Sequence, residues 1–402
     1  METTTIDEIQ AREGRYVLQT YKRLPVTFVR GQGVRLYDAD GREYLDLLSG
    51  IGVASLGHAH PGLARAIADQ AQTLLHTSNL FYHPLQGQLA ERLASLSGLP
   101  RAFFCNSGTE AVEACLKFAR RYWHARGGPR AEFIAFENSF HGRTFGALSV
   151  TSNEHYRTPF EPLLPGIRFV PVNDPKALLA AVSNSTAAII AEPVQGEGGV
   201  RLLTEAFAAA ITQAASTTGA LIIADEVQSG LGRTGYPFYS SVLGLHPHLI
   251  SIGKALGGGV PVGAALVSQE VADTISFGDH GSTYGGNLLA CRAALCFLDE
   301  LDRGGLLGQV ARVGDHLGRS LRSLAARHPM IKEVRGAGLI WGLELTCDAT
   351  PIVQEGLARG VIVNRTAETV VRLLPPLVIT EAEVDAALGR LDAAFAAVGA
   401  AQ

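Results

Sequence analysis

Lysine is scarce in this sequence of 402 residues. Lysine and arginine together number 34, but only five of these residues are lysines. An arginine guanidinium stays protonated and cannot form an imine, whereas a lysine amine in a desolvated pocket can lose its proton and attack a carbonyl. Because this chain nearly always uses arginine where a positive charge suffices, a lysine that follows a buried segment is a candidate for covalent chemistry.

The sequence also lacks a basic excess, a long apolar run and a secretion signal. Its formal net charge is -4, and no run of lysines or arginines would follow a phosphate backbone, so we expect no nucleic-acid partner. No stretch approaches the ~20 uninterrupted apolar residues of a membrane span, and residues 1–8 lack the basic leader and apolar core of a signal peptide. We therefore expect a cytoplasmic protein that does not enter a membrane.

Cysteine and metal-ligand patterns are weak. The five cysteines are an odd number and contain no CxxC pair, so the sequence predicts neither a disulfide framework nor a zinc site. His58 and His60 stand beside Pro61 and could suggest a metal, but no third ligand is near. Helix capping or loop hydrogen bonding is favoured for both histidines, and we expect no metal.

The patterns that are present are typical of an α/β protein. Hydrophobic residues make up 47% of the chain. Its length suggests roughly two or three domains, because a domain commonly contains ~150 residues. Between about residues 62 and 275, helical stretches alternate with short apolar runs. Strands that are apolar on both faces and separated by helices predict a mostly parallel central sheet covered by helices on both faces. The runs cover residues 102–105, 133–136, 167–170, 187–191, 220–224 and 249–252.

The same patterns divide the chain into three parts. Residues 1–61 are expected to form an N-terminal helical arm and a hairpin, with strands over residues 34–38 and 43–46. Residues 62–284 are expected to form the large α/β domain. Residues 285–402 contain two long amphipathic helices, further strands and a closing helix, which predict a smaller α+β C-terminal domain.

Two chemistry-bearing residues follow neighbouring apolar runs. Asp225 ends the run at 220–224, and Lys254 follows the run at 249–252 inside a glycine-rich turn. Both are expected at the carboxyl edge of the sheet, where ligands of such folds bind. A lysine can hold pyridoxal phosphate as an imine, and an aspartate beside the pyridine nitrogen keeps the ring protonated as an electron sink. The alternative is a surface lysine after a strand.

A predicted helix beginning near Gly108 offers a place for the cofactor's phosphate. Ser107, Gly108 and Thr109 would lie at its N-terminus, where free amides and the helix dipole favour anions. The alternative for this segment is an ordinary capping box. After the next strand, Phe140 could stack on a planar ring, and the planar fork of Arg143 suits a carboxylate.

The stretch Gly230–Gly235 satisfies the pattern GxGxxG. It begins five residues after its strand, no clear helix opens from it, and no acidic residue ends the following strand to bind a ribose. A nucleotide site is therefore not expected there.

Taken together, these segments resemble the class III, ornithine-type aminotransferases of the fold-type I pyridoxal-phosphate enzymes. The resemblance covers residues 25 to 395, and the segments follow the family's order. It implies the fold-type I architecture, pyridoxal phosphate as cofactor, and a homodimer with active sites at the subunit interface. One departure is Leu288, where the family usually has proline; the change adds a backbone donor in a loop. The matching segments are Asn106–Glu110, Phe140–Arg143, Glu192–Gly199, Asp225–Gln228, Lys254 and His280–Asn287.

The resemblance also implies roles for individual residues. Lys254 would be the Schiff-base lysine and proton carrier, and Asp225 the partner of the pyridinium nitrogen. Gln228 would contact the ring hydroxyl, and Phe140 would stack on the ring. The phosphate would be held by Gly108, Thr109 and the partner subunit's Thr283.

Within the family, the chain is most similar to the acetylornithine aminotransferases, which move the terminal amino group of N2-acetylornithine to 2-oxoglutarate. Ile51 stands where ornithine aminotransferases carry a tyrosine that helps seat free ornithine. An isoleucine cannot hydrogen-bond a free α-ammonium, so a donor whose α-nitrogen is acylated or absent fits better. The 4-aminobutyrate enzymes share such an isoleucine but not the stretch His76–Asn79. Succinylornithine, N2-acetyl-lysine and 4-aminobutyrate remain alternative donors, and an aminomutase or a catalytically silent relative is less favoured.

Two arginines suit the carboxylates of a transaminase that handles glutamate. Arg143 is expected to bind the α-carboxylate of the acylated diamine and the side-chain carboxylate of glutamate, with Ser282 of the partner subunit nearby. As the resemblance implies, Glu197 would pair with Arg372 while the diamine reacts, then release it to bind the α-carboxylate of glutamate. The alternative is that Glu197 merely occupies a glycine-rich loop.

Overall fold

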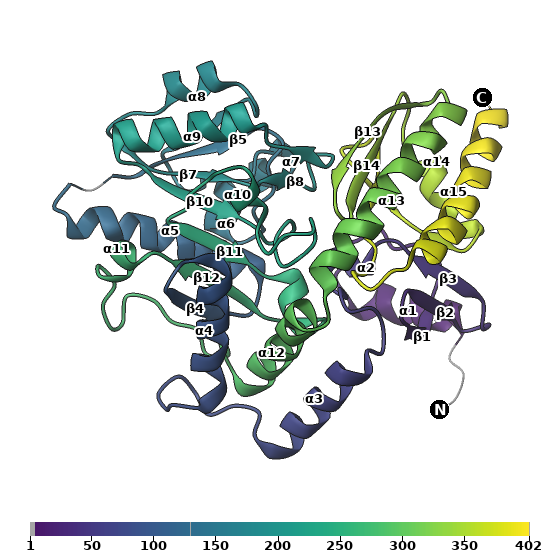
Figure 1. Cartoon of the computed structure of the whole chain (residues 1–402), viewed down its shortest axis with the longest axis horizontal. Helices are drawn as coiled ribbons and strands as arrows, with labels where there is room; N and C mark the ends of the chain where they lie inside the picture. Colours follow the sequence, from purple (N-terminus) through teal and green to yellow (C-terminus); the bar gives the residue numbers. More distant parts are fainter. Residues whose placement is uncertain (1–4, 129, 402) are drawn as a thin grey trace.

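The computed structural model describes residues 5–128 and 130–401 and contains a large domain and a smaller one side by side (Figure 1). A seven-stranded sheet with the order β4-β12-β11-β10-β7-β5-β6 forms the centre of the large domain. All six strands expected from the apolar runs are present, and the four neighbouring pairs from β11 to β6 are parallel. These strands are β4 (Arg101–Cys105), β5 (Glu132–Phe136), β6 (Ile167–Val170), β7 (Thr186–Ala191), β10 (Leu221–Asp225) and β11 (Leu249–Ile252).

The seventh strand, β12 (Gly263–Val267), was not predicted. It runs antiparallel to both of its neighbours, β11 and β4. The expected mostly parallel sheet is therefore confirmed, with one antiparallel insertion.

Helices cover both faces of this sheet, as predicted. Alternate residues of β10 point to opposite faces: Ile222 packs in the core cluster that contains helix α9, and Ile223 packs in the cluster that contains α5. The helices of this domain are α3 (Pro61–Thr73), α4 (Pro84–Ser97), α5 (Gly108–Ala125), α8 (Pro175–Ala181) and α9 (Glu205–Thr218). Helix α12 (Leu288–Asp302), which belongs to the segment expected as the smaller domain, packs against α3 and α4 of the large domain. The shorter elements are α2 (Ser49–Gly52), α6 (Phe145–Ser149), α7 (Glu154–Arg157), η1 (Thr158–Phe160), β8 (Val194–Gln195), β9 (Arg201–Leu202), α10 (Tyr239–Val242), η2 (Lys254–Gly257) and α11 (Gln269–Ala272).

The N-terminal part begins with helix α1 (Ile6–Tyr16), shorter than the expected arm of about 30 residues. The expected hairpin is present as β2 (Arg35–Asp38) and β3 (Glu43–Asp46), with β1 (Phe28–Gln32) beside it. Strand β3 also pairs in parallel with β15 (Val361–Ile362). The hairpin and the C-terminal part of the chain therefore share one sheet.

The smaller domain contains a second four-stranded sheet, ordered β13-β14-β17-β16. Its pairs are antiparallel, and helices α13 and α15 pack together beside it (Figure 1). The elements are α13 (Leu306–Arg327), β13 (Ile331–Ala337), β14 (Ile340–Leu345), α14 (Thr350–Ala358), β16 (Asn364–Thr366), β17 (Val370–Leu373) and α15 (Glu381–Ala401). The expected α+β character is confirmed, although β13 was not predicted.

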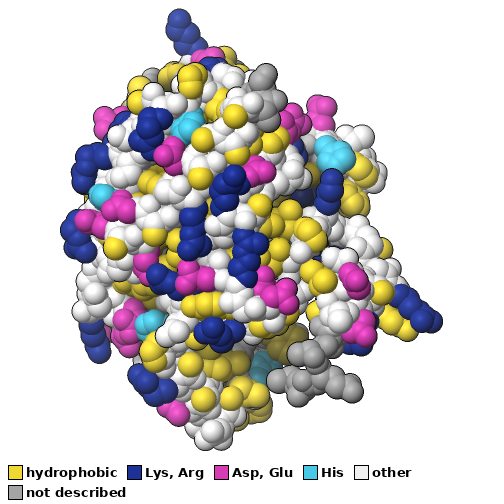
Figure 2. All heavy atoms as spheres, turned by 90° about the vertical axis from the view of Figure 1, so that its right-hand side faces the viewer, with side chains coloured by type: hydrophobic (Ala, Val, Ile, Leu, Met, Phe, Trp, Pro, Cys, Tyr) yellow, Lys and Arg dark blue, Asp and Glu magenta, His cyan; other side chains and the backbone are white. Residues whose placement is uncertain are grey.

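The surface carries side chains of both charges, in agreement with the small net charge of the chain (Figure 2). Figure 2, which faces the smaller domain, shows basic and acidic side chains interspersed.

His60 caps helix α3 by accepting a hydrogen bond from the amide of Leu63, and His58 contacts Asp46 at 2.7 Å. Both histidines therefore have local roles of the expected kind. Within the described part of the chain, each helix is too short or too polar to span a membrane.

Candidate active site

Asp225 and Lys254 meet at the carboxyl edge of the large sheet. Strands β10 and β11 are parallel, with Asp225 beside Ser251, and Lys254 begins η2 just after β11. Both side chains line a cavity of about 250 Å³. The cavity is lined by Gly108, Thr109, Phe140, His141, Gly142, Arg143, Glu192, Glu197, Asp225, Val227, Gln228 and Lys254.

The lysine has an unusual backbone and a perturbed amine. Its φ of 40° lies in the left-handed region, which is uncommon for a residue with a side chain. Burial lowers the pKa of the Lys254 amine, although the carboxylates of Glu197 and Asp225 oppose the shift. Since a deprotonated amine is the nucleophile in imine formation, this environment favours the reactive form.

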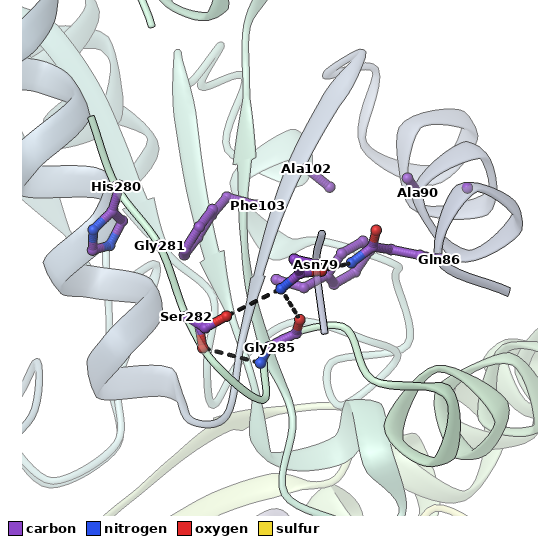
Figure 3. A pocket seen from close by; sticks show the side chains of 11 residues that line it. Asn79, Gln86, Ala90, Ala102, Phe103, His280, Gly281, Ser282 and Gly285 are labelled. Carbon is purple, nitrogen blue, oxygen red and sulfur yellow. Dashed lines mark hydrogen bonds between the residues drawn. The ribbon is translucent and has the colours of Figure 1, made fainter. Parts of the chain in front are cut away.

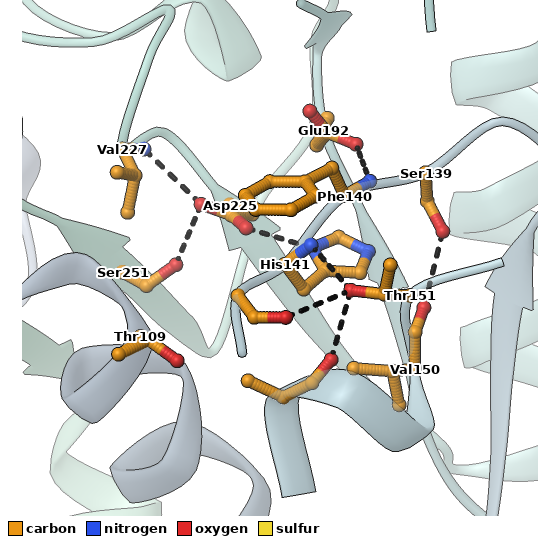
Figure 4. Close-up of polar contacts among 12 residues, drawn as sticks. Thr109, Ser139, Phe140, His141, Val150, Thr151, Glu192, Asp225, Val227 and Ser251 are labelled. Atoms are coloured by element: carbon orange, nitrogen blue, oxygen red, sulfur yellow. Dashed lines mark hydrogen bonds and ion pairs between the residues drawn. The ribbon is translucent and has the colours of Figure 1, made fainter. Parts of the chain in front are cut away.

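Asp225 is fixed by three hydrogen bonds (Figure 4). Its Oδ2 lies 2.7 Å from Nδ1 of His141, while Oδ1 accepts from the hydroxyl of Ser251 at 3.0 Å and from the amide of Val227 at 3.1 Å. Asp225 and His141 are both buried. The carboxylate is therefore held in one orientation at the floor of the cavity.

Two other buried side chains near Asp225, those of His141 and Glu192, have shifted pKa values. Burial alone would lower the pKa of His141, but its hydrogen bond to Asp225 and the charge of Asp225 raise it above the ordinary value. Burial raises the pKa of Glu192 to about 8, with the charge of His141 opposing. Glu192 Oε1 accepts from the amide of Phe140 at 2.9 Å. Nε2 of His141 is buried and has no hydrogen-bond partner within the described part of the chain.

The N-terminus of the 18-residue helix α5 opens into the same cavity. Ser107 is its N-cap and accepts from the amide of Glu110. The Ser107 hydroxyl also donates to the Glu110 carboxylate at 3.0 Å. The amides of Gly108 and Thr109 are among the first four of the helix, which have no intrahelical acceptor. They remain suited to an anion.

Arg143 lies at the mouth of the cavity on an aromatic side chain. Its guanidinium carbon is 3.6 Å from the centre of the Tyr156 ring and 5.6 Å from that of Phe140. Such stacking restricts the guanidinium while its N–H groups stay available.

Glu197 and Arg372 form an ion pair between the two domains. Arg372 Nη1 lies 2.5 Å from Oε1 of Glu197 and 3.2 Å from Oε1 of Gln228. Burial alone would raise the pKa of Glu197, but the charge and hydrogen bond of Arg372 lower it. Arg372 is fully buried, and its Nη2 has no hydrogen-bond partner among the described residues.

Five predicted site residues do not line this cavity. Two of them, Ser107 and Arg372, adjoin it through the contacts described above, and the other three lie elsewhere. Ser282 and Thr283 lie on a loop near a separate cavity of about 430 Å³, where Asn79 Nδ2 donates to the carbonyls of Ser282 and Gly285 (Figure 3). Ile51 lies in α2, next to Gly52. A Cβ at Gly52 would lie 3.9 Å from Lys254 Cδ, so this segment lies close to the lysine.

The sequence matches a known family over nearly the whole chain. Residues 16–395 fit the family model described as Aminotransferase class-III. The chain belongs to the class III aminotransferases. These enzymes use pyridoxal phosphate, so this chain is a pyridoxal-phosphate-dependent aminotransferase.

Individual relatives are similar over nearly their full length. The chain is 45% identical over 384 residues to the acetylornithine aminotransferase of Methanocaldococcus jannaschii, covering 95% of this chain and 96% of that one. It is 46% identical over 377 residues to the acetylornithine aminotransferase of Archaeoglobus fulgidus, with coverages of 94% and 97%. A structure of the ornithine aminotransferase of Toxoplasma gondii, with partial occupancy of pyridoxal phosphate at its active site, has a TM-score of 0.95 and 33% identity, with coverages of 99% and 96%.

The residues of the cavity fit pyridoxal phosphate. An amine with a lowered pKa, a fixed carboxylate and free helix amides are the groups that its aldehyde, ring nitrogen and phosphate require. The apolar side chains of Phe140 and Val227 also line the cavity. The donor set therefore suits each part of the cofactor.

Sequence reasoning did not assign roles to His141, Glu192, Val227 or Tyr156. The first three lie inside segments that carried the resemblance, and a buried ionisable residue within such a segment was an available signal. Tyr156 lies 13 residues after Arg143, and nothing in the sequence indicated that the two side chains stack.

Proposed function

We propose that this aminotransferase moves the δ-amino group of N2-acetylornithine to 2-oxoglutarate, giving N-acetylglutamate 5-semialdehyde and glutamate, or runs the reverse reaction. The observation that carries the proposal is the pairing of Glu197 with Arg372 at 2.5 Å. An acylated diamine has only hydrogen on the reacting carbon. Since an unpaired buried guanidinium is costly, a site for this donor needs a neutralised arginine.

The relatives favour the acylated donor over free ornithine. The two curated relatives cited above, at 45% and 46% identity over nearly the whole chain, are both named acetylornithine aminotransferase. Ile51 agrees with this preference, because its side chain offers no hydrogen bond to a free α-ammonium.

Each cavity residue has its own role in this proposed reaction. The bound cofactor supplies an electron sink for the carbon that loses its proton. Lys254 binds the cofactor and afterwards holds and returns the proton at the reacting carbon. Asp225, fixed by His141 and Ser251, keeps the ring nitrogen protonated. The amides of Gly108 and Thr109 bind the phosphate, and Phe140 covers the ring.

The two substrates place their carboxylates differently. Arg143 binds the α-carboxylate of acetylornithine, which lies far from the reacting δ-amine, and in the other half-reaction the side-chain carboxylate of glutamate. When glutamate or 2-oxoglutarate enters, the Glu197 side chain moves aside and Arg372 binds the α-carboxylate. The buried Nη2 of Arg372 has no partner among the described residues and supports this assignment.

The active enzyme is proposed to be a cytoplasmic homodimer that shares residues between its sites. Thr283 and Ser282 lie outside the cavity of their own chain, as they must if they act in the partner's site. Large exposed apolar side chains flank their loop, a pattern that marks an interaction surface. These side chains are Leu80, Phe81, Tyr82, Phe277 and Tyr284.

A donor panel tests the substrate. Glutamate formation from 2-oxoglutarate is measured with N2-acetylornithine, N2-succinylornithine, N2-acetyl-lysine, free ornithine and 4-aminobutyrate, ranked by kcat/KM. The proposal predicts that acetylornithine ranks first. A higher kcat/KM for ornithine or 4-aminobutyrate would contradict it.

Hybrid dimers test the shared site. Lys254→Ala removes the lysine from every site of its own homodimer. Thr283→Asp also damages every site of its homodimer, because the aspartate charge repels a phosphate. A hybrid of the two variants contains one intact site, so random reassortment should restore up to about a quarter of the wild-type activity. Absence of any recovery in verified hybrids would show that Thr283 does not act across the interface.

A further inference from the structure

Arg233 is a buried arginine inside the Gly230–Gly235 stretch, to which the catalytic site assigns no role. Its side chain is 2% exposed. Burial lowers the pKa of the guanidinium to about 9, although the charge of Asp46 opposes the shift. A buried charge is weak evidence of a contribution to stability, because its desolvation offsets most of its attraction to other groups.

The guanidinium joins three separate segments through neutral oxygens. Nη1 donates to the carbonyls of Leu339 and Pro375, which belong to the smaller domain. Nη2 donates to the Ser55 hydroxyl at 3.5 Å. Planar arginine can serve several acceptors at fixed angles, which a lysine ammonium on a flexible stem cannot.

Main-chain contacts tighten the same junction. The amide of Leu339 donates to the carbonyl of Arg233 at 2.9 Å. Gly338 packs so closely that a Cβ there would lie 2.5 Å from the carbonyl carbon of Thr234. The turn between β13 and β14 therefore rests directly on the large-domain loop that contains Arg233.

This junction lies between the two groups that must act together on glutamate. Pro375 follows Arg372 by three residues, just beyond the end of β17. On the other side, a Cβ at Gly52 would lie 3.9 Å from Lys254 Cδ and 4.0 Å from Arg233 Nη2. Arg233 therefore connects the strand that carries Arg372 to the surroundings of Lys254.

We propose that Arg233 is a positioning residue that fixes Arg372 relative to Lys254 and thereby sets the preference for glutamate over terminal-amine donors. Glutamate carries its α-carboxylate on the reacting carbon, so groups on both domains must hold that carbon at once. A terminal-amine donor has only hydrogen there and does not use Arg372. A loosened junction should therefore impair glutamate selectively. This inference rests on the proposed function.

The test compares Arg233→Met with the wild type, because methionine fills a similar length without the hydrogen bonds. We measure kcat/KM for glutamate and for acetylornithine in separate half-reactions, together with Tm. The ratio of kcat/KM for glutamate to kcat/KM for acetylornithine should fall about tenfold or more, mainly through a higher KM for glutamate. Arg233→Lys should lower the ratio by a smaller factor.

Arg130→Met is the matched control. Arg130 also donates to two carbonyls, those of Thr186 and Thr218, but within the large domain. The Arg130→Met variant should change Tm without changing the ratio of the two kcat/KM values. An unchanged ratio in Arg233→Met would overturn the proposal, whatever happens to Tm. If Arg233→Met does not fold, Arg233→Lys decides: an unchanged ratio in that variant overturns the proposal.

Failure of the proposed substrate remains distinguishable. The wild type is assayed first with the donor panel, and its best terminal-amine donor becomes the reference. If acetylornithine is not used, the proposed substrate is wrong, while the effect of Arg233 on the glutamate ratio is still measured against that reference.

Discussion

His141 and Asp225 form a buried pair at the carboxyl edge of the sheet, with Nδ1 of the histidine 2.7 Å from Oδ2 of the aspartate. The pairing raises the pKa of His141 despite its burial. The other carboxylate oxygen is bound by Ser251 and by the amide of Val227. Asp225 is therefore oriented from both sides and ready to bind a protonated ring nitrogen.

Asp225→Asn should retain cofactor but lose several orders of magnitude in kcat, because an amide cannot keep the ring nitrogen protonated. Ser251→Ala is the control: it removes one hydrogen bond to Asp225 but leaves the carboxylate, and its loss should be far smaller. Steady-state kinetics and the absorbance of bound cofactor measure both. Near-wild-type activity in Asp225→Asn would make this residue structural.

Lys254→Ala should abolish turnover and the visible absorption band of the lysine-linked cofactor. Some cofactor should still bind, since the amides at the N-terminus of α5 are unchanged. Cofactor content after gel filtration and activity at saturating substrate give the two readings. Normal turnover in this variant would refute the assignment of the site.

Glu192 should make stability depend on pH. Its pKa in the folded protein is raised from the ordinary 4.5 to about 8, mainly by burial, so the folded state binds the proton more tightly than the unfolded state. This contribution is fully present below pH 4.5 and is lost as the pH rises through about 8. One pKa unit corresponds to about 1.4 kcal/mol, so a shift from 4.5 to about 8 corresponds to a loss on the order of 5 kcal/mol.

Glu192→Gln mimics the protonated side chain and can still accept from the amide of Phe140. Denaturant unfolding of the cofactor-free protein should show a shallower loss of stability across this range in the variant than in the wild type. Parallel pH profiles for the two proteins would mean that Glu192 does not titrate there.

Arg143→Ala should raise KM for acetylornithine and for glutamate, by an amount corresponding to about 1.5–3 kcal/mol for a charge-assisted contact. Tyr156→Leu removes the aromatic ring under the guanidinium and should raise both KM values by a smaller factor. Tyr156→Phe keeps the ring and should resemble the wild type. Unchanged KM values in Arg143→Ala would refute its role in binding carboxylates.

The strands of the parallel sheet were predictable because their runs are apolar on both faces. Strand β12 was missed because it begins Gly-Ala-Ala, residues with little preference for strands. The small side chains are required by packing: a Cβ at Gly263 would lie 2.3 Å from the carbonyl oxygen of Ser107. That contact joins distant parts of the chain, so no local pattern indicates it.

The same limit applies to the site. Asp225 and Lys254 were predictable because Asp225 ends one core strand, Lys254 follows the next, and the two strands are neighbours in the sheet. The stacking of Arg143 on Tyr156 and the junction at Arg233 depend on side-chain directions in loops. Periodicity carries no information about such directions.

The pairing of Glu197 with Arg372 leads to the most direct test of how one site serves two amines. Single-turnover rates of the diamine and glutamate half-reactions are measured in Glu197→Ala and Arg372→Ala. Arg372→Ala should damage mainly the glutamate half-reaction, whereas Glu197→Ala should leave Arg372 always available, favour glutamate and weaken discrimination for the terminal amine. Equal losses in both half-reactions for either variant would contradict the account.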